Sequence, residues 1–488
     1  MRLSYILNAL STVIIYIGIF LLLPVLVALI YKDYSSIIPF LSSALLTVSI
    51  GLLIKKIYPQ AAKLENLNDI KKSEALFIVA VSWIIFAVIA ALPYMFYNLT
   101  FVDALFEATS GITTTGATIF KTFNYAHALL FWRSLTQWLG GIGIIVLFVA
   151  VLPQFAVAGR QMFFAETPGP TEDKFTPRVR STAILLWSLY LGLTLFAIIC
   201  LTIAGMPLFD SICNAMSTLA AGGFSPNSNS IMGYHSSIVT WIILIFMFFA
   251  GSSMNLQYKV LVKKKNPFLF FKSEEFCLYF WVVIISSAAI AYVLITKDHY
   301  GMHSAVRHSL FQVISIMTST GSASVDFAQW SYPAKILLFI TMFFGSCASS
   351  AGGGIKMTRW LLVFKSMKAE LVRILHPNAV INVKVEDTAV SPEVLRQVIV
   401  FVFYYFAIFI LGAILITFIE HNHIYGLTSS ITALGNIGPG FGAIGPMGSF
   451  ADFHISSKLI MIFWMLIGRL EIIPFLVMTQ RDFWSIKV

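Results

Sequence analysis

The chain has 488 residues, of which 58% are hydrophobic and only 11% are charged, with a mean hydropathy of +0.86. Soluble domains carry about 25% charged residues, so this composition excludes a chain built mainly of soluble domains. The formal net charge of +10 could indicate a nucleic-acid partner, and the placement of the positive charges decides whether it does.

Long apolar segments account for this composition. A helix needs about 20 residues to cross a bilayer, and uninterrupted runs of that length cover residues 5–30, 74–97, 129–152, 183–205, 237–256, 276–295, 398–419 and 455–478. Shorter or interrupted runs lie at 37–54 and 334–370. The first run is longer than a signal-peptide core, so we expect a retained helix. The segments predict an all-α polytopic membrane protein with ten transmembrane helices.

The positive charges follow this predicted topology. With the N-terminus inside, most of the 32 lysines and arginines fall in inner loops; the outer loops keep only Lys32, Lys121, Lys297, Arg307, Lys335 and Lys458, and two lie in apolar segments, Arg133 and Arg469. Such an excess inside is typical of membrane proteins. The basic run 263–265 therefore indicates topology first and lipid contact second, and we expect no nucleic-acid partner. Both termini are predicted to be cytoplasmic.

A glycine-centred segment occurs four times between long apolar runs. The segments read FEATSGITTTGAT (106–118), ICNAMSTLAAGGFS (212–225), FQVISIMTSTGSAS (311–324) and TSSITALGNIGPG (428–440). They include short helices, predicted at about 103–113, 208–219, 304–318 and 425–434, and Asp103 and Asp210 stand where an acidic N-cap is favoured. Irregular backbone at membrane depth occurs where it lines a cavity or is buried in protein. The pattern predicts four helix–pore-loop–helix repeats around one pore, after a two-helix leader.

The loops after the short helices lack carboxylates. Aligned on their glycines, they consist of Thr114, Thr115, Gly116, Ala220, Ala221, Gly222, Ser319, Thr320, Gly321, Asn436, Ile437 and Gly438. Stacked backbone carbonyls replace the hydration shell of K⁺ in potassium channels, and glycine leaves no side chain in the lumen. The short helices also direct their partially negative C-terminal ends at the centre. We therefore predict a K⁺ filter at these residues; helix packing by glycine is the alternative.

These motifs resemble the Trk/Ktr/HKT superfamily of potassium transporters, and most closely its TrkH branch. The resemblance extends over essentially the whole chain, through SGITTTGAT, GGFS at 222–225, TSTGS, GNIGPGFG, SSAGGGIK and GRLEI. It implies potassium uptake across the bacterial inner membrane, a homodimer, and a cytosolic nucleotide-binding subunit of the TrkA type. Ala220 and Ala221 depart from the hydroxyl residues that are common in the family.

The repeats divide the chain into five predicted parts. Residues 1–70 form the leader, 71–180 the first pore repeat, 181–272 the second, 273–390 the third with an intramembrane gating loop, and 391–488 the fourth.

A Gly- and Ser-rich tract, GSCASSAGGG at 345–354, interrupts the last apolar run of the third repeat. Such a tract does not form a stable straight helix. The resemblance implies a loop that obstructs the pore, with gate residues Gly345, Ser349, Ser350, Gly352, Gly353 and Gly354; a packing kink is the alternative.

Arg469 lies within the last apolar run, where a charge is costly and usually faces a pore or a polar partner. We interpret it as a cationic barrier below the filter and part of the gate. A structural salt bridge is the alternative, although Glu471 would not face Arg469 on a helix. Arg133, nearer the outer end of its run, is given a structural role.

The remaining candidate residues indicate no catalytic chemistry. The four cysteines form no CxxC pair, and His299 and His303 lack matching acidic or Cys residues, so we expect no disulfide framework, no metal centre and no organic cofactor. Paired acids and an activated nucleophile are also missing, which argues against an enzyme. The alternatives that remain are an ion-coupled secondary transporter of another solute and a Na⁺-permeable cation transporter. Symport with H⁺ or Na⁺ and channel-like flow both stay open.

Overall fold

The computed structural model describes residues 3–58, 72–141, 143, 179–263, 265–379, 381–386 and 388–480. These residues form helices apart from one antiparallel hairpin, made of β1 (Lys384–Val385) and β2 (Thr388–Ala389). The parts of the predicted inner loops at 59–71 and 144–178, and the terminal residues 481–488, lie outside the described residues.

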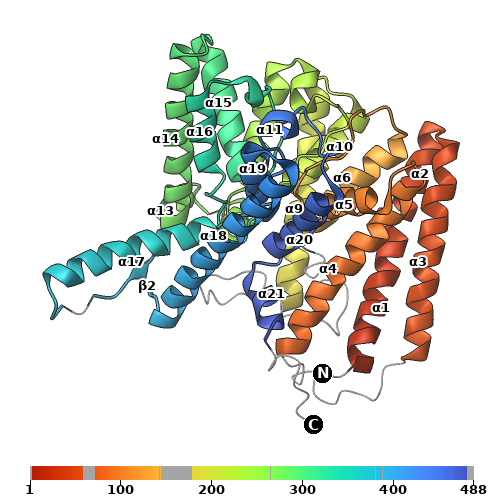
Figure 1. The fold of residues 1–488 in the computed structure, drawn as a ribbon, viewed down its shortest axis with the longest axis horizontal. Helices are drawn as coiled ribbons and strands as arrows, with labels where there is room; N and C mark the ends of the chain where they lie inside the picture. The colour runs from red at the N-terminus through yellow and green to blue at the C-terminus, as the bar shows by residue number, and fades with distance from the viewer. Residues whose placement is uncertain are drawn as a thin grey trace.

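The N-terminal part contains α1 (Leu3–Phe20), α2 (Leu22–Tyr31) and α3 (Ile37–Ile57). Helices α1 and α2 are separated by a single residue, and together they pass as one span, Ile6–Tyr31. Gly18 faces Val48 and Gly51 faces Ile15 so closely that an added Cβ would lie within 2.7 Å of either side chain. Small residues of this kind let membrane helices approach each other, which explains the tight α1–α3 pair at one side of Figure 1.

A pattern of three helices then occurs four times. Each begins with a long apolar helix: α4 (Lys72–Met95), α9 (Val179–Ile203), α14 (Glu274–Thr296) and α18 (Pro392–Glu420). A short helix follows: α5 (Phe101–Ile112), α10 (Leu208–Leu219), α15 (Met302–Met317) and α19 (His423–Leu434). The third helix ends early: α6 (His127–Gly141), α11 (Ser237–Ala250), α16 (Tyr332–Thr341) and α20 (Ile455–Arg469). The four short helices lie where the sequence predicts them; the division of the chain into five parts stays a prediction.

The ends of two short helices differ from expectation. Thr100, and not Asp103, caps α5 by accepting a hydrogen bond from the Asp103 N–H at 3.2 Å. Pro207 holds the corresponding position of α10, so Asp210 also lies inside the first turn. Both carboxylates still lie at the positive end of a helix dipole.

Six helices among the described residues are long and apolar enough to cross a membrane, and a seventh span results if α11 and α12 (Met254–Leu261) are counted as one despite a bend of 106°. The prediction of ten transmembrane helices is therefore not confirmed. The run 237–256 bends after Ala250, 334–370 is divided between α16 and α17 (Met357–Leu375), and 455–478 between α20 and α21 (Ile473–Met478). The run 129–152 ends as a helix at Gly141, and its residues 142 and 144–152 lie outside the described residues.

The breaks have a local cause. Glycine and serine follow α11 at 251–253 and fill the tract between α16 and α17, and both residue types weaken helices. After α20, Glu471 and Ile472 adopt positive φ values of 58° and 33°. Short helices complete the structure: α13 (Leu269–Lys272), η1 (Tyr34–Ser36), η3 (Ser230–Tyr234), η4 (Phe327–Gln329) and η5 (Gly442–Ile444). Helix α17 projects from the bundle, with β2 beside it (Figure 1).

Candidate functional site

Each short helix ends in a turn of the same backbone geometry. Two residues before a glycine, a residue with a side chain adopts φ between 54° and 56°; these residues are Thr114, Ala221, Ser319 and Asn436. The glycines Gly116, Gly223, Gly321 and Gly438 have φ of 81°, 77°, 73° and 102°. Positive φ is uncommon for residues with a Cβ, so the surrounding protein must hold these turns. They form one motif that occurs once in each repeat.

The turn of the second repeat corrects the sequence alignment by one residue. In the other three repeats, the residue just before the ring glycine donates its N–H to the carbonyl five positions earlier. In the second repeat, Gly222 makes this bond, to the Ser217 carbonyl at 2.9 Å. Gly223, and not Gly222, therefore takes the glycine position of this repeat. Ala220 is the C-cap of α10 and does not belong to the aligned segment, which consists of residues 221–223.

The four turns close into a ring. A Cβ added to a ring glycine would collide with a backbone carbonyl oxygen of the following repeat: Gly116 with Gly222 at 2.2 Å, Gly223 with Thr320 at 1.8 Å, Gly321 with Ile437 at 2.2 Å and Gly438 with Thr115 at 2.5 Å. The order of contacts runs from the first repeat to the fourth and back to the first. Glycine is required at all four positions because the neighbouring carbonyl leaves no space for a side chain.

Most of the four carbonyl oxygens that face the ring glycines accept no hydrogen bond from a described residue. No described residue donates a hydrogen bond to the carbonyl of Thr115, Thr320 or Ile437, although all three residues are buried. Buried carbonyl groups without partners are uncommon. The fourth carbonyl, that of Gly222, accepts a bond of 2.6 Å from Gln137 Nε2.

A cavity of about 570 Å³ opens on one side of the ring and is lined by all four ring glycines. Its wall also carries charged side chains, namely Lys121, Arg133, Glu420 and Asp452.

The loop 345–354 lies on the other side of the ring. Gly353 donates its N–H to Ser319 Oγ at 2.6 Å. A Cβ added to Gly352 would lie 2.6 Å from the Thr318 carbonyl oxygen, and one added to Gly353 would lie 2.6 Å from that of Gly435. The loop is therefore in direct contact with the ends of α15 and α19.

Hydrogen bonds hold the base of this loop. The Gly345 N–H bonds to the Ile355 carbonyl at 2.9 Å, which joins the two ends. Glu275, at the start of α14, accepts from the Ala348 N–H at 2.6 Å, and Lys356 Nζ donates to carbonyls within the loop.

The other predicted gate residues also lie in this network. Ser349, with φ of 57°, accepts a bond from the Met254 N–H at 3.2 Å, and the Ser350 hydroxyl bonds to that of Ser346 at 2.6 Å. Gly354 has a φ of 71°, which favours glycine.

Arg469, the last residue of α20, joins the loop to the first repeat. Its Nη1 donates to the Ala351 carbonyl at 2.9 Å, and its Nη2 donates to the carbonyls of Gly140 and Gly141 at 2.5 and 3.0 Å. The guanidinium thus bonds to the loop of the third repeat and to the end of α6. These contacts give Arg469 three backbone carbonyls as hydrogen-bond acceptors.

A buried ion pair lies behind the first turn. Arg133 Nε and Glu107 Oε1 are 2.8 Å apart, and their side chains are 2% and 0% exposed. Glu107 also accepts from the Ile119 N–H at 2.9 Å, and Arg133 donates to the Thr118 hydroxyl at 3.1 Å. The pair therefore fixes the backbone just beyond Gly116. Sequence reasoning did not predict Glu107 as the partner of Arg133. The signal for it was that each is a single charge in a largely apolar segment.

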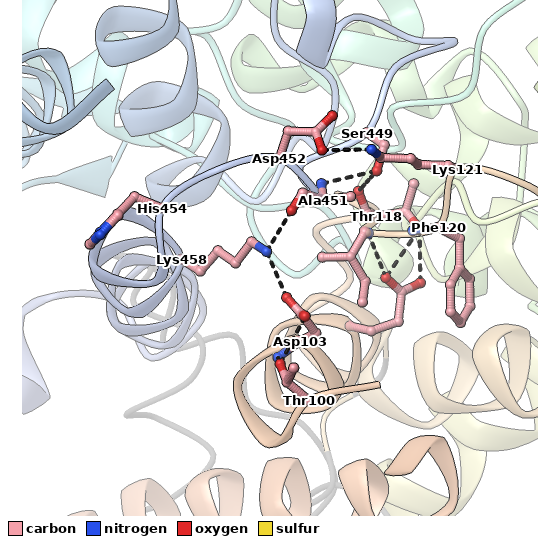
Figure 2. Close-up of polar contacts among 12 residues, drawn as sticks. Thr100, Asp103, Thr118, Phe120, Lys121, Ser449, Ala451, Asp452, His454 and Lys458 are labelled. Carbon is pink, nitrogen blue, oxygen red and sulfur yellow. Dashed lines mark hydrogen bonds and ion pairs between the residues drawn. The ribbon is translucent and has the colours of Figure 1, made fainter. Parts of the chain in front are cut away.

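The loop between α19 and α20 of the fourth repeat contacts the first repeat (Figure 2). The Phe450 N–H bonds to the Thr118 carbonyl at 2.9 Å. Lys458 Nζ lies 2.7 Å from Asp103 Oδ1 and is almost completely buried, whereas the pair of Lys121 and Asp452, at 2.6 Å, is exposed. These contacts join the first and fourth repeats, which are neighbours in the ring but are not consecutive in the chain.

The other candidates are not brought to the ring. Glu471 pairs with Arg359, and the four cysteines are free thiols. Among the described residues, no group of three or more His, Cys, Asp or Glu side chains lies close enough to hold a metal ion.

Comparison with known proteins identifies the family. Residues 48–286 and 268–485 match the TrkH family, described as cation transport protein. The Trk system potassium uptake proteins TrkH of Salmonella typhimurium and Escherichia coli K12 are 36% and 35% identical to the chain over 470 residues, with 95% of each chain covered. The crystal structure of the potassium transporter TrkH from Vibrio parahaemolyticus matches with a TM-score of 0.89 at 29% identity, covering 99% of this chain and 100% of that one. The chain belongs to the TrkH family of cation transport proteins.

Proposed function

We propose that this chain takes up K⁺ across the bacterial inner membrane through the ring of four turns. The main support for the proposal is that the four turns form a closed ring, because each ring glycine lies against a carbonyl oxygen of the next repeat. Carbonyls without protein donors can replace the hydration shell of K⁺. The names of the relatives, potassium uptake proteins, support K⁺ as the ion.

Replacement of a ring glycine tests this function. Gly116→Ser would place a Cβ 2.2 Å from the Gly222 carbonyl oxygen, at a φ of 81° that disfavours side chains, so the ring must distort. We expect the ratio of K⁺ to Na⁺ flux into proteoliposomes to fall. Gly192→Ser is the matched control, because nothing lies within 4 Å of its added Cβ.

Potassium-limited growth of a transport-deficient host tests uptake itself. Failure of the parent chain to support growth, or an unchanged flux ratio in Gly116→Ser, would contradict the proposal. A ratio near one in the parent chain would instead indicate a Na⁺-permeable transporter.

The gate in this proposal is the loop 345–354 together with Arg469. The contacts of Gly353 with Ser319 and of Arg469 with Ala351 support it, because they hold the loop against the ring. A guanidinium about 6 Å from a K⁺ ion would repel it by roughly 3 kcal/mol at an effective dielectric constant near 20. Such a barrier slows the ion yet can be relieved by a conformational change.

The proposal includes a homodimer and a cytosolic nucleotide-binding subunit of the TrkA type. Exposed basic side chains support an inner docking surface for an acidic partner; they are Lys263, Lys265, Lys272, Lys368, Lys384 and Arg396. The proposed docking segments are residues 259–272 and 356–396, and of these residues 264, 380 and 387 lie outside the described residues. Co-purification with a co-expressed subunit of this type should be lost when Lys263 and Lys265 are both changed to Glu, and a conductance that ignores ATP and ADP would contradict the partner.

A further inference from the structure

One ring carbonyl differs from the others. Among residues 114–116, 221–223, 319–321 and 436–438, only Gly222 has a carbonyl that accepts a hydrogen bond from a described residue, and the donor is Gln137 Nε2 at 2.6 Å. Gln137 Oε1 accepts in turn from the Phe224 N–H at 3.0 Å. The amide therefore holds the second turn from both sides of Gly223. Gln137 is fully buried, so water does not compete for these bonds.

The donor comes from a different repeat. Gln137 lies on α6, between Arg133, which reaches the Ser225 carbonyl at 3.5 Å, and Gly141, whose added Cβ would lie 2.7 Å from the Ala220 Cα. Spacing of four residues places these three on one face of the helix. This face of α6 therefore contacts the second turn along its whole length, from Ala220 to Ser225.

The other turns are supported differently. Glu107 bonds to the Ile119 N–H, Ser315 to the Ser322 carbonyl and Thr428 to the Phe441 N–H, each from the short helix of the same repeat. None of these bonds reaches a carbonyl at the level of Gly222.

We propose that Gln137 is a positioning residue that fixes the Gly222 carbonyl in the ring and thereby sets the discrimination of K⁺ against Na⁺. This inference rests on the proposed function. A carbonyl has two lone pairs; the amide occupies one and restrains the oxygen, while the other remains for the ion. Selectivity depends on the number, position and field strength of the coordinating carbonyls. A released Gly222 carbonyl can move towards a smaller ion, so loss of the amide donor favours Na⁺.

Two substitutions separate the donor from the acceptor. Gln137→Met removes both bonds at similar volume. Gln137→Glu keeps an acceptor for the Phe224 N–H, and its ionised carboxylate has no proton to donate to Gly222. A net hydrogen bond is worth about 0.5–1.5 kcal/mol, so we expect the ratio of K⁺ to Na⁺ flux to fall about two- to tenfold in both variants.

Gln312 provides the matched control. It is fully buried on α15, and neither its Nε2 nor its Oε1 has a hydrogen-bond partner among the described residues. Gln312→Met should leave the flux ratio unchanged. The ratio is measured on folded protein in liposomes and does not depend on the amount of protein, so a lower yield does not imitate the effect.

The outcomes distinguish this inference from the proposed function. If K⁺ and Na⁺ fluxes fall together in both Gln137 variants, or if Gln137→Met behaves like the parent, the residue is only structural and the inference is wrong. Gly116→Ser is measured beside them. A changed ratio in Gly116→Ser alone overturns only the role of Gln137, whereas an unchanged ratio in Gly116→Ser overturns the filter.

Discussion

Removing one partner of the Glu107–Arg133 pair should destabilise the protein strongly. The two charges are 2.8 Å apart and almost fully buried, so neither single variant lets the remaining charge reach water. Breaking such a pair costs about 3–5 kcal/mol. In Glu107→Gln, the guanidinium keeps its contacts with the rings of Phe120, Phe123 and Phe224, at 5.0, 4.8 and 4.1 Å. Contacts of this kind are worth about 0.5–2 kcal/mol each.

Arg133→Met should therefore cost more than Glu107→Gln. It leaves a buried carboxylate whose remaining partners are the Thr118 hydroxyl and the Ile119 N–H. The double variant removes both charges, and replacement of a buried pair by apolar or neutral groups is often close to neutral. We expect its free energy of unfolding to exceed that of either single variant.

The free energy of unfolding is measured by denaturant titration in detergent for the parent, both single variants and the double variant. The exposed pair of Lys121 and Asp452, with side chains 57% and 80% exposed, is the control, and breaking it should cost less than about 1 kcal/mol. If the double variant loses as much free energy of unfolding as the two single variants together, the reasoning is refuted. Such additivity would mean that the two side chains contribute independently and not as a pair.

Three further predictions concern the gate and the ring closure. Arg469→Ala should raise basal K⁺ flux into liposomes without a partner subunit, because it frees the Ala351 carbonyl of the loop; an unchanged flux places the barrier elsewhere. Glu275→Ala should also raise basal flux, since the loop loses its bond from the Ala348 N–H, and Glu275→Gln, which keeps an acceptor, should have a smaller effect. Lys458→Met should lower the free energy of unfolding by about 1–3 kcal/mol, because Lys458 is 4% exposed and the Asp103 side chain is 22% exposed; a loss no greater than that of Lys121→Met would mean that its ion pair contributes little.

The short helices could be predicted from the sequence because their ends carry strong local signals. Each is an apolar stretch too short to span a bilayer, followed by a glycine turn, and α10 begins and ends where the sequence places it. The continuous third helices were not predictable in the same way. Apolar composition shows where a segment can lie in a membrane, but the positive φ of Glu471 and Ile472 depends on tertiary packing.

The register of the second turn shows a signal that sequence reasoning missed. Two adjacent glycines at 222 and 223 make either one a possible match to Gly116. The observed last residue of each short helix decides between them, because Ile112, Leu219, Met317 and Leu434 all lie four positions before a ring glycine; the predicted ends at 113 and 318 are one residue too late to show this. This spacing selects Gly223. For Gln137, the sequence contains no comparable signal. A buried amide is expected to have a hydrogen-bond partner, but the sequence does not show which residue it is.

Helix α6 connects the two halves of the site. Its middle holds the Gly222 carbonyl through Gln137, and its last carbonyls, those of Gly140 and Gly141, accept the bonds of Arg469. Three residues of helix, about 5 Å at 1.5 Å per residue, separate these contacts. An added Cβ on Gly140 would lie 1.8 Å from the Ile112 carbonyl, so α6 is packed against α5 without free space. A displacement of Arg469 that keeps these bonds therefore moves the helix that holds the second turn, and the loop and the ring are mechanically joined through it.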